Sequence, residues 1–309
     1  MSLLKQKNTR LDKRFDKIKL KEEQGQVKNY IRNRALNKMF GNKLAVIGLF
    51  FVTIVILSSI FAPLICKYDP QKVNLRKMLK PPSTENILGT DKVGRDVYAR
   101  IIYGGRISIL VGLGSAIGAA LIGVSIGAYT GYRGGWIDSL FLRISEIVMA
   151  FPQIILVLLL VAILGQSLMN LMIIFIFTGW GGLFRMTRAQ MLSLREEEYV
   201  QALKAFGLSS FRIAFKHILP NALGPIMVNI TLSTAMFILQ EAGLSFLGLG
   251  VPLNIPTWGN ILNVAIDLRI LENYWWVWFP VAVMISLFVL SVNFIGDGLR
   301  DSTDPSLQG

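Results

Sequence analysis

The chain has 309 residues, of which 53% are hydrophobic, and its mean hydropathy is +0.52. An apolar share this high excludes an ordinary soluble protein and indicates an integral membrane protein. The formal net charge is +13, but the basic residues gather where apolar runs end, which indicates a membrane protein embedded in a lipid bilayer and argues against nucleic-acid binding.

Residues 1–43 are strongly basic, with thirteen Lys or Arg against four acidic residues. The positive-inside rule therefore places this segment in the cytoplasm. Ala35, Leu36 and Met39 share one side of a helical wheel, which predicts an interfacial helix, while a disordered basic tail is an equal alternative before Asn29. Charges this early in the chain favour an uncleaved first span over a signal peptide.

Leu44–Ile65 is an uncharged run of 22 residues, long enough to cross a hydrocarbon core of roughly 30 Å as a helix. This predicts the first transmembrane helix at 44–66, leading outward. The polar segment 67–106 follows and is expected outside, with short helices of its own. Its basic residues argue against that location, but the denser charge of the N-terminal segment fixes the first span.

Residues 107–297 are predicted to hold five more spans, followed by a cytoplasmic tail at 298–309. The expected spans are 107–130, 136–164, 171–192, 225–239 and 279–295. Small residues in the first of these five allow neighbouring helices to approach closely. The outer surface is expected to carry an aromatic belt formed by Trp258, Trp275, Trp276 and Trp278.

Two of the spans carry polar side chains that need an explanation. In the third span, Arg143 and Glu146 lie three residues apart and are expected to form a structural ion pair rather than to act in transport. In and just beyond the fifth span, Asn229, Ser233 and Gln240 must face protein or water. Interhelical hydrogen bonding and the wall of a possible translocation path explain these three residues equally well.

Residues 193–222 are a polar loop between the fourth and fifth spans. Its first half carries an apolar face with the i, i+3, i+4, i+7 spacing of a short helix, formed by Tyr199, Ala202, Leu203 and Phe206. Gly207 is expected to end this helix in the left-handed conformation. Ser209 or Ser210 is then expected to cap a second helix that runs to His217.

Histidine and cysteine each occur once, as His217 and Cys66. A lone cysteine cannot form an internal disulfide and is expected to act as a small hydrophobic residue. The sequence contains no H-E-x-x-H pattern, no cysteine pair and no G-x-x-x-x-G-K-[ST] loop. We therefore expect no catalytic, cofactor-binding or metal site, and any ATP that drives this protein must be bound by a partner.

Four stretches of the sequence carry a family resemblance. They are LGTDKVGRDVYARIIYGGRIS at Leu88–Ser108, GYRGGWID at Gly131–Asp138, LSFLGLGVPLNIPTWG at Leu244–Gly259 and GDGLRDSTDP at Gly296–Pro305. Over about its whole length, the chain resembles the permease subunits of bacterial ABC importers for oligopeptides, dipeptides and nickel, in particular the subunit with the longer N-terminal region. The resemblance implies an all-α integral membrane protein with six transmembrane helices, in the type I ABC importer permease fold with a cytoplasmic coupling-helix loop.

The 193–222 loop resembles the ATPase-coupling motif of this family, written E-A-A, three residues, G, nine residues, I-x-L-P. The chain departs from the motif at Gln201, Leu203 and His217, which favours docking by shape and apolar contact over a salt bridge. The resemblance assigns ATPase coupling to Glu198, Tyr199, Gln201, Ala202, Leu203, Phe206, Gly207, His217, Leu219 and Pro220.

The resemblance also implies partners and a location. The expected partners are a homologous second permease subunit, two ATP-binding subunits that hold ATP and Mg, and an external substrate-binding protein. The expected location is the bacterial cytoplasmic membrane, with both termini in the cytoplasm. Closure of the ATPases would move the docked helix pair and so switch the accessible side of the path.

The cargo and the mode of transport leave alternatives open. Peptide is favoured over nickel because no histidine lies on the presumed path. The alternatives are a nickel or other small-solute ABC permease, a stand-alone secondary transporter and a structural scaffold subunit. A secondary transporter would need ionisable residues for ion coupling inside its spans, and the apolar cores of the first, second and sixth spans lack them.

Overall fold

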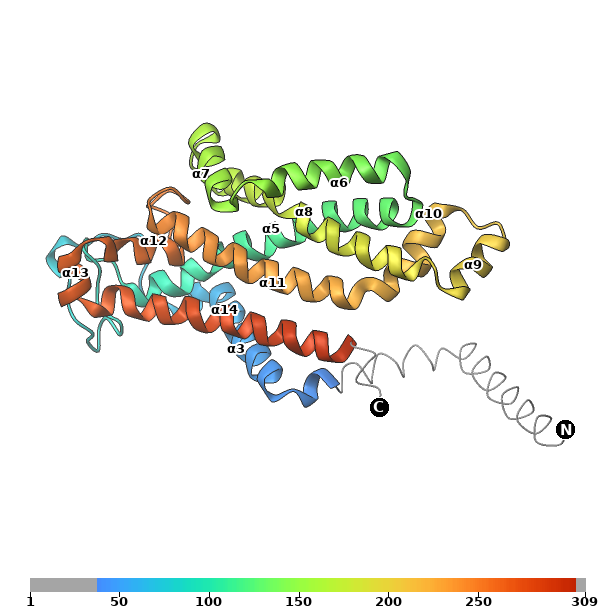
Figure 1. The fold of residues 1–309 in the computed structure, drawn as a ribbon. Helices are drawn as coiled ribbons and strands as arrows, with labels where there is room; N and C mark the ends of the chain where they lie inside the picture. Colours follow the sequence, from blue (N-terminus) through green and yellow to red (C-terminus); the bar gives the residue numbers. More distant parts are fainter. Residues whose placement is uncertain (1–37, 304–309) are drawn as a thin grey trace.

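The computed structural model describes residues 38–303 and shows a long bundle of helices (Figure 1). Within this range there is no β-strand, and the one isolated bridge joins Thr90 to Asp96. The longer helices are α3 (Lys43–Ile60), α5 (Val97–Arg133), α6 (Gly135–Ala150), α7 (Gln153–Leu164), α8 (Leu168–Leu194), α11 (Leu219–Phe246) and α14 (Trp275–Thr303). The shorter ones are α4 (Ala62–Ile65), η1 (Leu75–Lys77), α9 (Glu198–Ala205), α10 (Ser210–Arg212), η2 (Ile213–Ile218), α12 (Trp258–Leu262), η3 (Asn263–Ile266) and α13 (Leu268–Asn273).

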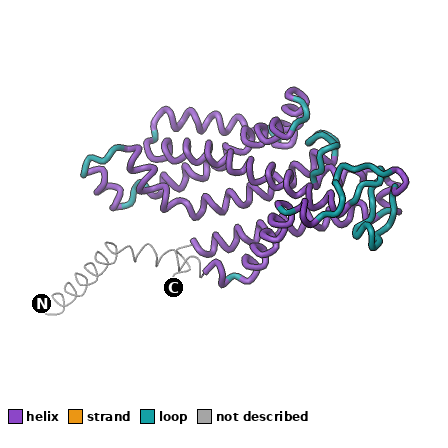
Figure 2. The backbone as a smooth tube through the Cα atoms, turned by 180° about the vertical axis from the view of Figure 1, so that it is seen from behind, coloured by secondary structure: helices purple, strands orange, loops and turns teal. Residues whose placement is uncertain are grey.

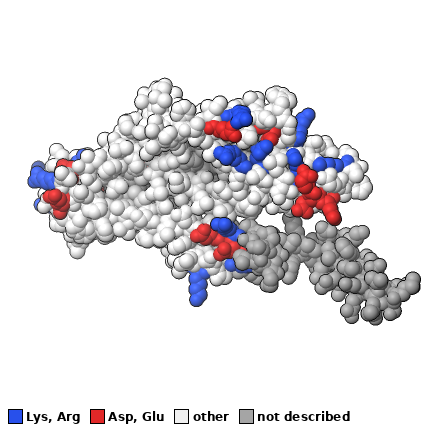
Figure 3. Space-filling model, viewed as in Figure 1, with Lys and Arg blue, Asp and Glu red and all other residues white. Residues whose placement is uncertain are grey.

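The helices α5, α8, α11 and α14 run along the bundle, and α7 stands across it (Figures 1 and 2). In the described part of the chain, five helices are long and apolar enough to cross a membrane, and the bent pair α6 and α7 makes a sixth crossing if it counts as one span. Charged side chains gather toward the two ends and leave an uncharged band between them (Figure 3). An uncharged band around a bundle of fully hydrogen-bonded helices fits the hydrocarbon core of a bilayer.

Two capping residues fix where the first membrane helices begin. The Asn42 side chain accepts hydrogen bonds from the N–H groups of Leu44 and Ala45 at the start of α3, and it donates one to Asp301 near the end of α14. Asp96 caps α5 in the same way, so this helix begins at Val97 and not at the predicted 107. The interfacial helix predicted around Ala35 and Leu36 and the end of the C-terminal tail lie outside the described residues.

The predicted third span is not one continuous helix, because the chain breaks between α6 and α7 and bends by 87°. Pro152 lacks a backbone N–H and disfavours helical geometry at the residue before it, and Phe151 accordingly has φ −88° and ψ 139°. The predicted pair Arg143–Glu146 is confirmed on α6, with 2.7 Å between the guanidinium and the carboxylate. A second pair joins α6 to α8, where Arg188 donates two hydrogen bonds of 2.6 Å to Asp138.

The predicted fifth span is confirmed, but it is longer than 225–239 and is not separate from the helix before it. The helical rod is continuous from Ser210 to Phe246, because the π-helical turn η2 joins α10 directly to α11. Pro220 is the second residue of α11 and lies just after η2, where the π-helical turn changes to α-helix. Any movement at the start of this rod is therefore carried into the membrane by one element.

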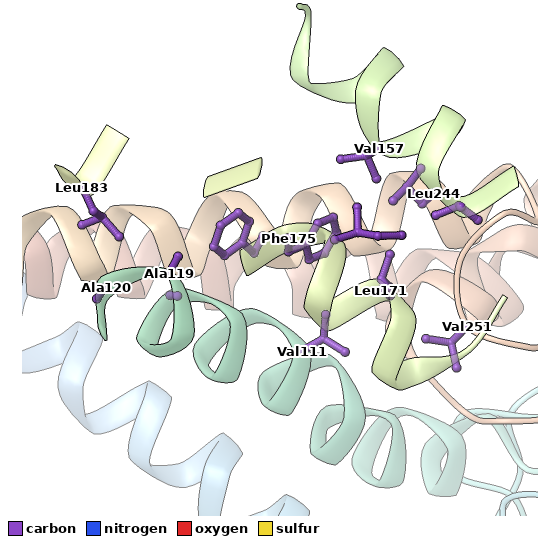
Figure 4. Packing of buried hydrophobic residues seen from close by; sticks show 13 residues of the cluster. Val111, Ala119, Ala120, Val157, Leu171, Phe175, Leu183, Leu244 and Val251 are labelled. Atoms are coloured by element: carbon purple, nitrogen blue, oxygen red, sulfur yellow. The ribbon is translucent and has the colours of Figure 1, made fainter. Parts of the chain in front are cut away.

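The main core lies where α5, α7, α8 and α11 meet (Figure 4). At its centre the rings of Phe175 and Phe237 stack at 5.2 Å. α5 crosses α8 closely, since a Cβ added at Gly123 or Gly127 would come within 2.5 or 2.7 Å of a backbone carbonyl of α8. The predicted role of small residues in close helix approach is thus confirmed for α5.

The aromatic belt is only partly as predicted. Trp275 is exposed and Trp278 is half-buried at the start of α14, which begins before the predicted 279. Trp258 lies in the core instead, 1% exposed, where its indole N–H donates to the carbonyl of Ile101 and its ring meets Phe288 edge-on. A tryptophan with its N–H satisfied inside the protein has no reason to sit at the headgroup level.

Candidate functional site

The loop between α8 and α11 folds as a helix, a turn and a helix at one end of the bundle (Figure 1). The short helix α9 ends at Gly207, which has φ +74° as predicted. The N–H groups of Gly207 and Leu208 donate to the carbonyls of Lys204 and Leu203, a pattern that closes helices when glycine takes the left-handed conformation. Ser209 precedes α10, but its side chain makes no capping hydrogen bond, so the predicted serine cap is not formed.

The inner side of α9 packs on the bundle through a single fully buried residue, Val200. This side chain belongs to a small core with Met191 of α8, Ala128 and Tyr132 of α5, and the buried face of η2. Burial of one valine stabilises by about 1.5–3 kcal/mol, a large anchor for an eight-residue helix. Leu203 is half-buried against the same core.

Two polar contacts add to this anchor. The ammonium group of Lys204 lies over the ring of Tyr132 at 5.6 Å, which joins α9 to α5. The Asn221 amide donates to the Tyr199 hydroxyl at 3.2 Å and to the carbonyl of His217 at 3.2 Å, which ties α9 to the start of α11. The short helix is therefore connected to α5, α8 and α11.

The outer side of the segment is exposed and partly apolar. Phe206 is 81% exposed at the turn, and Phe211 is 62% exposed on α10, where its ring lies 4.5 Å from that of Phe215. Exposed aromatic residues at a polar end of a protein make this segment a candidate docking surface. Of the predicted coupling residues, the exposed ones are Glu198, Tyr199, Gln201, Ala202, Phe206, Gly207 and Pro220, and the half-buried ones are Leu203, His217 and Leu219.

The structure changes which residues form the outer face. The predicted face included Leu203, which instead packs inward beside Val200. The short helix α9 has two apolar stripes. The spacing of its apolar residues does not say which stripe packs against the bundle and which stays exposed. Val200 and Phe211 were not among the residues predicted for this site. Phe211 and Phe215 are four residues apart, which places them on one face of a helix, so their pairing could have been predicted.

The predicted polar residues of α11 do not come together. Ser233 lines a cavity of about 480 Å³ between the α6–α7 break, α8 and the middle of α11. The Asn229 amide donates to the carbonyl of Pro225 on its own helix, and neither Asn229 nor Gln240 lines that cavity. Thr178 and Gln153 are the other polar residues that line this cavity. The cavity lies beside the helix break at Pro152.

A fully buried carboxylate was missed in the same helix. Glu241 lies beyond the predicted end of the fifth span, but the structure places it inside α11 with no exposed surface. Its two oxygens accept hydrogen bonds from the hydroxyls of Ser108 (3.1 Å) and Ser245 (2.8 Å). The Ser108 hydroxyl in turn accepts the backbone N–H of Trp258 at 3.1 Å, so the carboxylate links α5 and α11 to the start of α12.

Residues 38–303 contain no cluster of three or more His, Cys, Asp or Glu that could hold a metal ion. His217 is half-buried on η2. The arrangement is therefore that of a helical membrane protein with an anchored cluster of exposed aromatic residues at one end, a class to which transport permeases belong.

The chain belongs to the family described as binding-protein-dependent transport system inner membrane component, whose model matches residues 123–309. Residues 32–82 match the N-terminal TM domain of oligopeptide transport permease C. The protein is therefore a multi-pass permease subunit of the cytoplasmic membrane and not an enzyme.

Individual relatives cover almost the whole chain. The dipeptide transport system permease protein DppC of Alkalihalophilus pseudofirmus is 44% identical over 276 residues, covering 89% of this chain and 90% of that protein. The oligopeptide transport system permease protein OppC of Bacillus subtilis is 41% identical over 274 residues, covering 89% of each chain.

Proposed function

We propose that this chain is the transmembrane permease subunit of an ATP-driven importer of dipeptides and oligopeptides. The similarity to DppC and OppC supports a peptide cargo. The single observation that carries the coupling role is the exposed Phe206 on a helix that is itself anchored to α5, α8 and α11. An ATPase docked on this surface pulls or pushes three membrane helices at once.

The partners follow from this assignment. Two ATP-binding subunits hydrolyse ATP with Mg, and one of them receives the α9 turn. A homologous second permease completes the path, and an external substrate-binding protein delivers the peptide. In this arrangement both termini and residues 193–222 face the cytoplasm, while residues 66–96 and 247–274 face the outside.

The proposed function is tested by reconstituting the full chain, with the proteins that copurify with it, in proteoliposomes. We expect ATP-dependent uptake of a labelled dipeptide, and ATP hydrolysis that rises when the binding protein and peptide are added. Nickel uptake under the same conditions, with no peptide uptake, would support a nickel permease instead. Peptide uptake driven by an ion gradient without ATP would contradict the proposal and support a secondary transporter.

We further propose that the cavity at Ser233 belongs to the translocation path. Ser233 of α11 and the helix break at Pro152 both line this cavity. Non-helical backbone inside a membrane protein is found where it is buried in protein or lines a water-filled cavity. Movement of α11, which continues directly from the docked segment, would change the width of this cavity.

The path is tested by cysteine labelling in a variant whose Cys66 is replaced by serine. A membrane-impermeant thiol reagent is expected to modify S233C in the assembled complex, and bound peptide is expected to slow that reaction. The control is L239C, since Leu239 is 44% exposed on the same helix but does not line the cavity. Equal labelling of both cysteines, or none at S233C in every transport state, would remove Ser233 from the path.

A further inference from the structure

A second hollow of the molecule is a groove on its surface between α3 and α5. It has a volume of about 570 Å³ and, unlike the cavity at Ser233, is lined almost entirely by apolar side chains. Its two polar lining residues are Ser59 and Arg106, and the others are Ile56, Ile60, Ile109, Leu110, Leu113, Gly114 and Ile117. The groove is therefore suited to a ligand with a long apolar part and a small polar part.

The position of Arg106 defines the polar end of the groove. Its Nε and Nη2 atoms donate to the carbonyls of Ser59 and Ile60 at the end of α3, and its guanidinium lies 5.0 Å from the ring centre of Tyr103. Nη1 has no hydrogen-bond partner among the described residues, and Arg106 forms no ion pair with any described carboxylate. One positive charge with free donors thus remains at the mouth of the groove.

Arg106 also lines a polar hollow at the same end of the bundle, beside residues 66–71. Lys67 and Asp69 line that hollow too, and their opposite charges offset each other. Arg106 is therefore a cation with no ion-pair partner among the described residues, at the boundary between the polar end of the protein and its apolar band.

Ser59 lines the groove on the α3 side but offers it no polar atom. This residue is 3% exposed, and its hydroxyl is buried against Gly105 of α5. Arg106 is therefore the polar group that this groove offers to a ligand.

The length of the groove matches one leaflet of a bilayer. The eleven positions from Arg106 to Ile117 on α5 rise by about 16 Å at 1.5 Å per residue. Half of a hydrocarbon core of roughly 30 Å is about 15 Å. Leu110, Leu113 and Ile117 are 49%, 40% and 46% exposed, so the apolar floor of the groove is open along this length.

We propose that this groove binds one anionic phospholipid of the leaflet on the side of residues 66–96. Its phosphate pairs with Arg106, and one acyl chain lies along Leu110, Leu113 and Ile117. The lipid joins α3 to α5, which makes the position of the first membrane helix dependent on lipid composition. The proposal rests on membrane insertion alone and not on the identity of the cargo.

The test uses the full chain, with the proteins that copurify with it, in detergent. Native mass spectrometry with added dioleoyl-phosphatidylglycerol or dioleoyl-phosphatidylcholine measures how many lipids are retained. We expect one phosphatidylglycerol to be retained about fivefold more strongly than phosphatidylcholine, the size expected for one basic residue acting on an anionic headgroup. R106Q should abolish this preference.

A second variant separates lipid binding from folding, since R106Q also removes hydrogen bonds to the end of α3. L110W fills the groove and leaves Arg106 in place, so it should lose the bound lipid. L121W is the matched control, because Leu121 is 68% exposed on the same helix and does not line the groove. Retention of phosphatidylglycerol by L110W at the level of L121W, equal retention of both lipids by the unmodified chain, or a cross-link from L110C to the second permease in native membranes would overturn the proposal.

Discussion

Replacing Phe206 with serine is expected to weaken the docking of the partner ATPases while leaving the fold of the permease intact. Phe206 is 81% exposed and makes no contribution to the core that holds α9. Buried aromatic residues at the centre of an interface typically contribute about 2 kcal/mol or more to binding, which is roughly a 30-fold change in affinity. We therefore expect F206S to lose the partner ATPases on purification and to lose peptide-stimulated ATP hydrolysis.

The control for this experiment is W136S. Trp136 is 74% exposed on α6 and lies outside the α9–α10 segment, so its loss removes an equally exposed aromatic residue without touching the proposed docking surface. F206L should retain most of the coupling, because it keeps an apolar side chain at the turn. If F206S and W136S behaved alike in ATPase retention, the α9 turn would not be the docking surface.

Leu203 is unsuitable for the same test. It is half-buried against the core that contains Val200 and Met191, so an aspartate there would detach α9 from the bundle. A loss of coupling in L203D would then report a folding defect and not a lost contact. The distinction between Leu203 and Phe206 is one that only the packed structure provides.

Replacing Asp91 with alanine is expected to have the largest effect on stability. Arg100, which is 2% exposed, lies 2.5 Å from the Asp91 carboxylate, and Arg95 lies 2.7 Å from the same oxygen. Removing one partner of a buried ion pair leaves an uncompensated charge and costs about 3–5 kcal/mol. D91A should lower the thermal unfolding temperature in detergent and expose residues 66–96 to proteolysis.

The control for D91A is E85A in the same segment. Glu85 pairs with Lys77 at the protein surface, where the Glu85 side chain is 54% exposed and the Lys77 side chain 33% exposed, and surface pairs contribute little. We expect E85A to unfold at nearly the same temperature as the unmodified protein. Equal stability of D91A and E85A would show that the buried pair does not hold the segment.

The Asp91 contacts also predict a dependence on pH. Burial acts to raise the pKa of Asp91, but the guanidinium groups of Arg100 and Arg95 and a backbone N–H outweigh it, so the pKa is lowered below its ordinary value of 3.8. A lowered carboxyl pKa stabilises the folded state fully above the ordinary value, and this contribution is lost as the pH falls through the folded pKa. The stability difference between the unmodified protein and D91A should therefore shrink below about pH 4.

Most of the overall architecture could be predicted from the sequence, because the bilayer restricts which structures can cross it. Runs of about 20 apolar residues must be helices in lipid, and the basic residues between them give an orientation, so the class and the number of crossings follow from composition and order. The helix ends were less predictable. Asp96 begins α5 ten residues early, and η2 joins two predicted helices into one, because caps and turn geometry depend on local contacts that hydropathy does not register.

For the site, the local structure could be predicted from the sequence, but the packing could not. The sequence by itself determined that residues 193–222 form a helix, a turn at Gly207 and a second helix, since apolar spacing and a glycine are local signals. Only the tertiary structure decided that Val200 and Leu203 face the bundle while Phe206 faces outward, and that Ser233 shares a cavity with the break at Pro152. The reason is physical: a short helix with two apolar stripes is satisfied by burying either one, and the neighbouring helices α5 and α8 determine which stripe is covered.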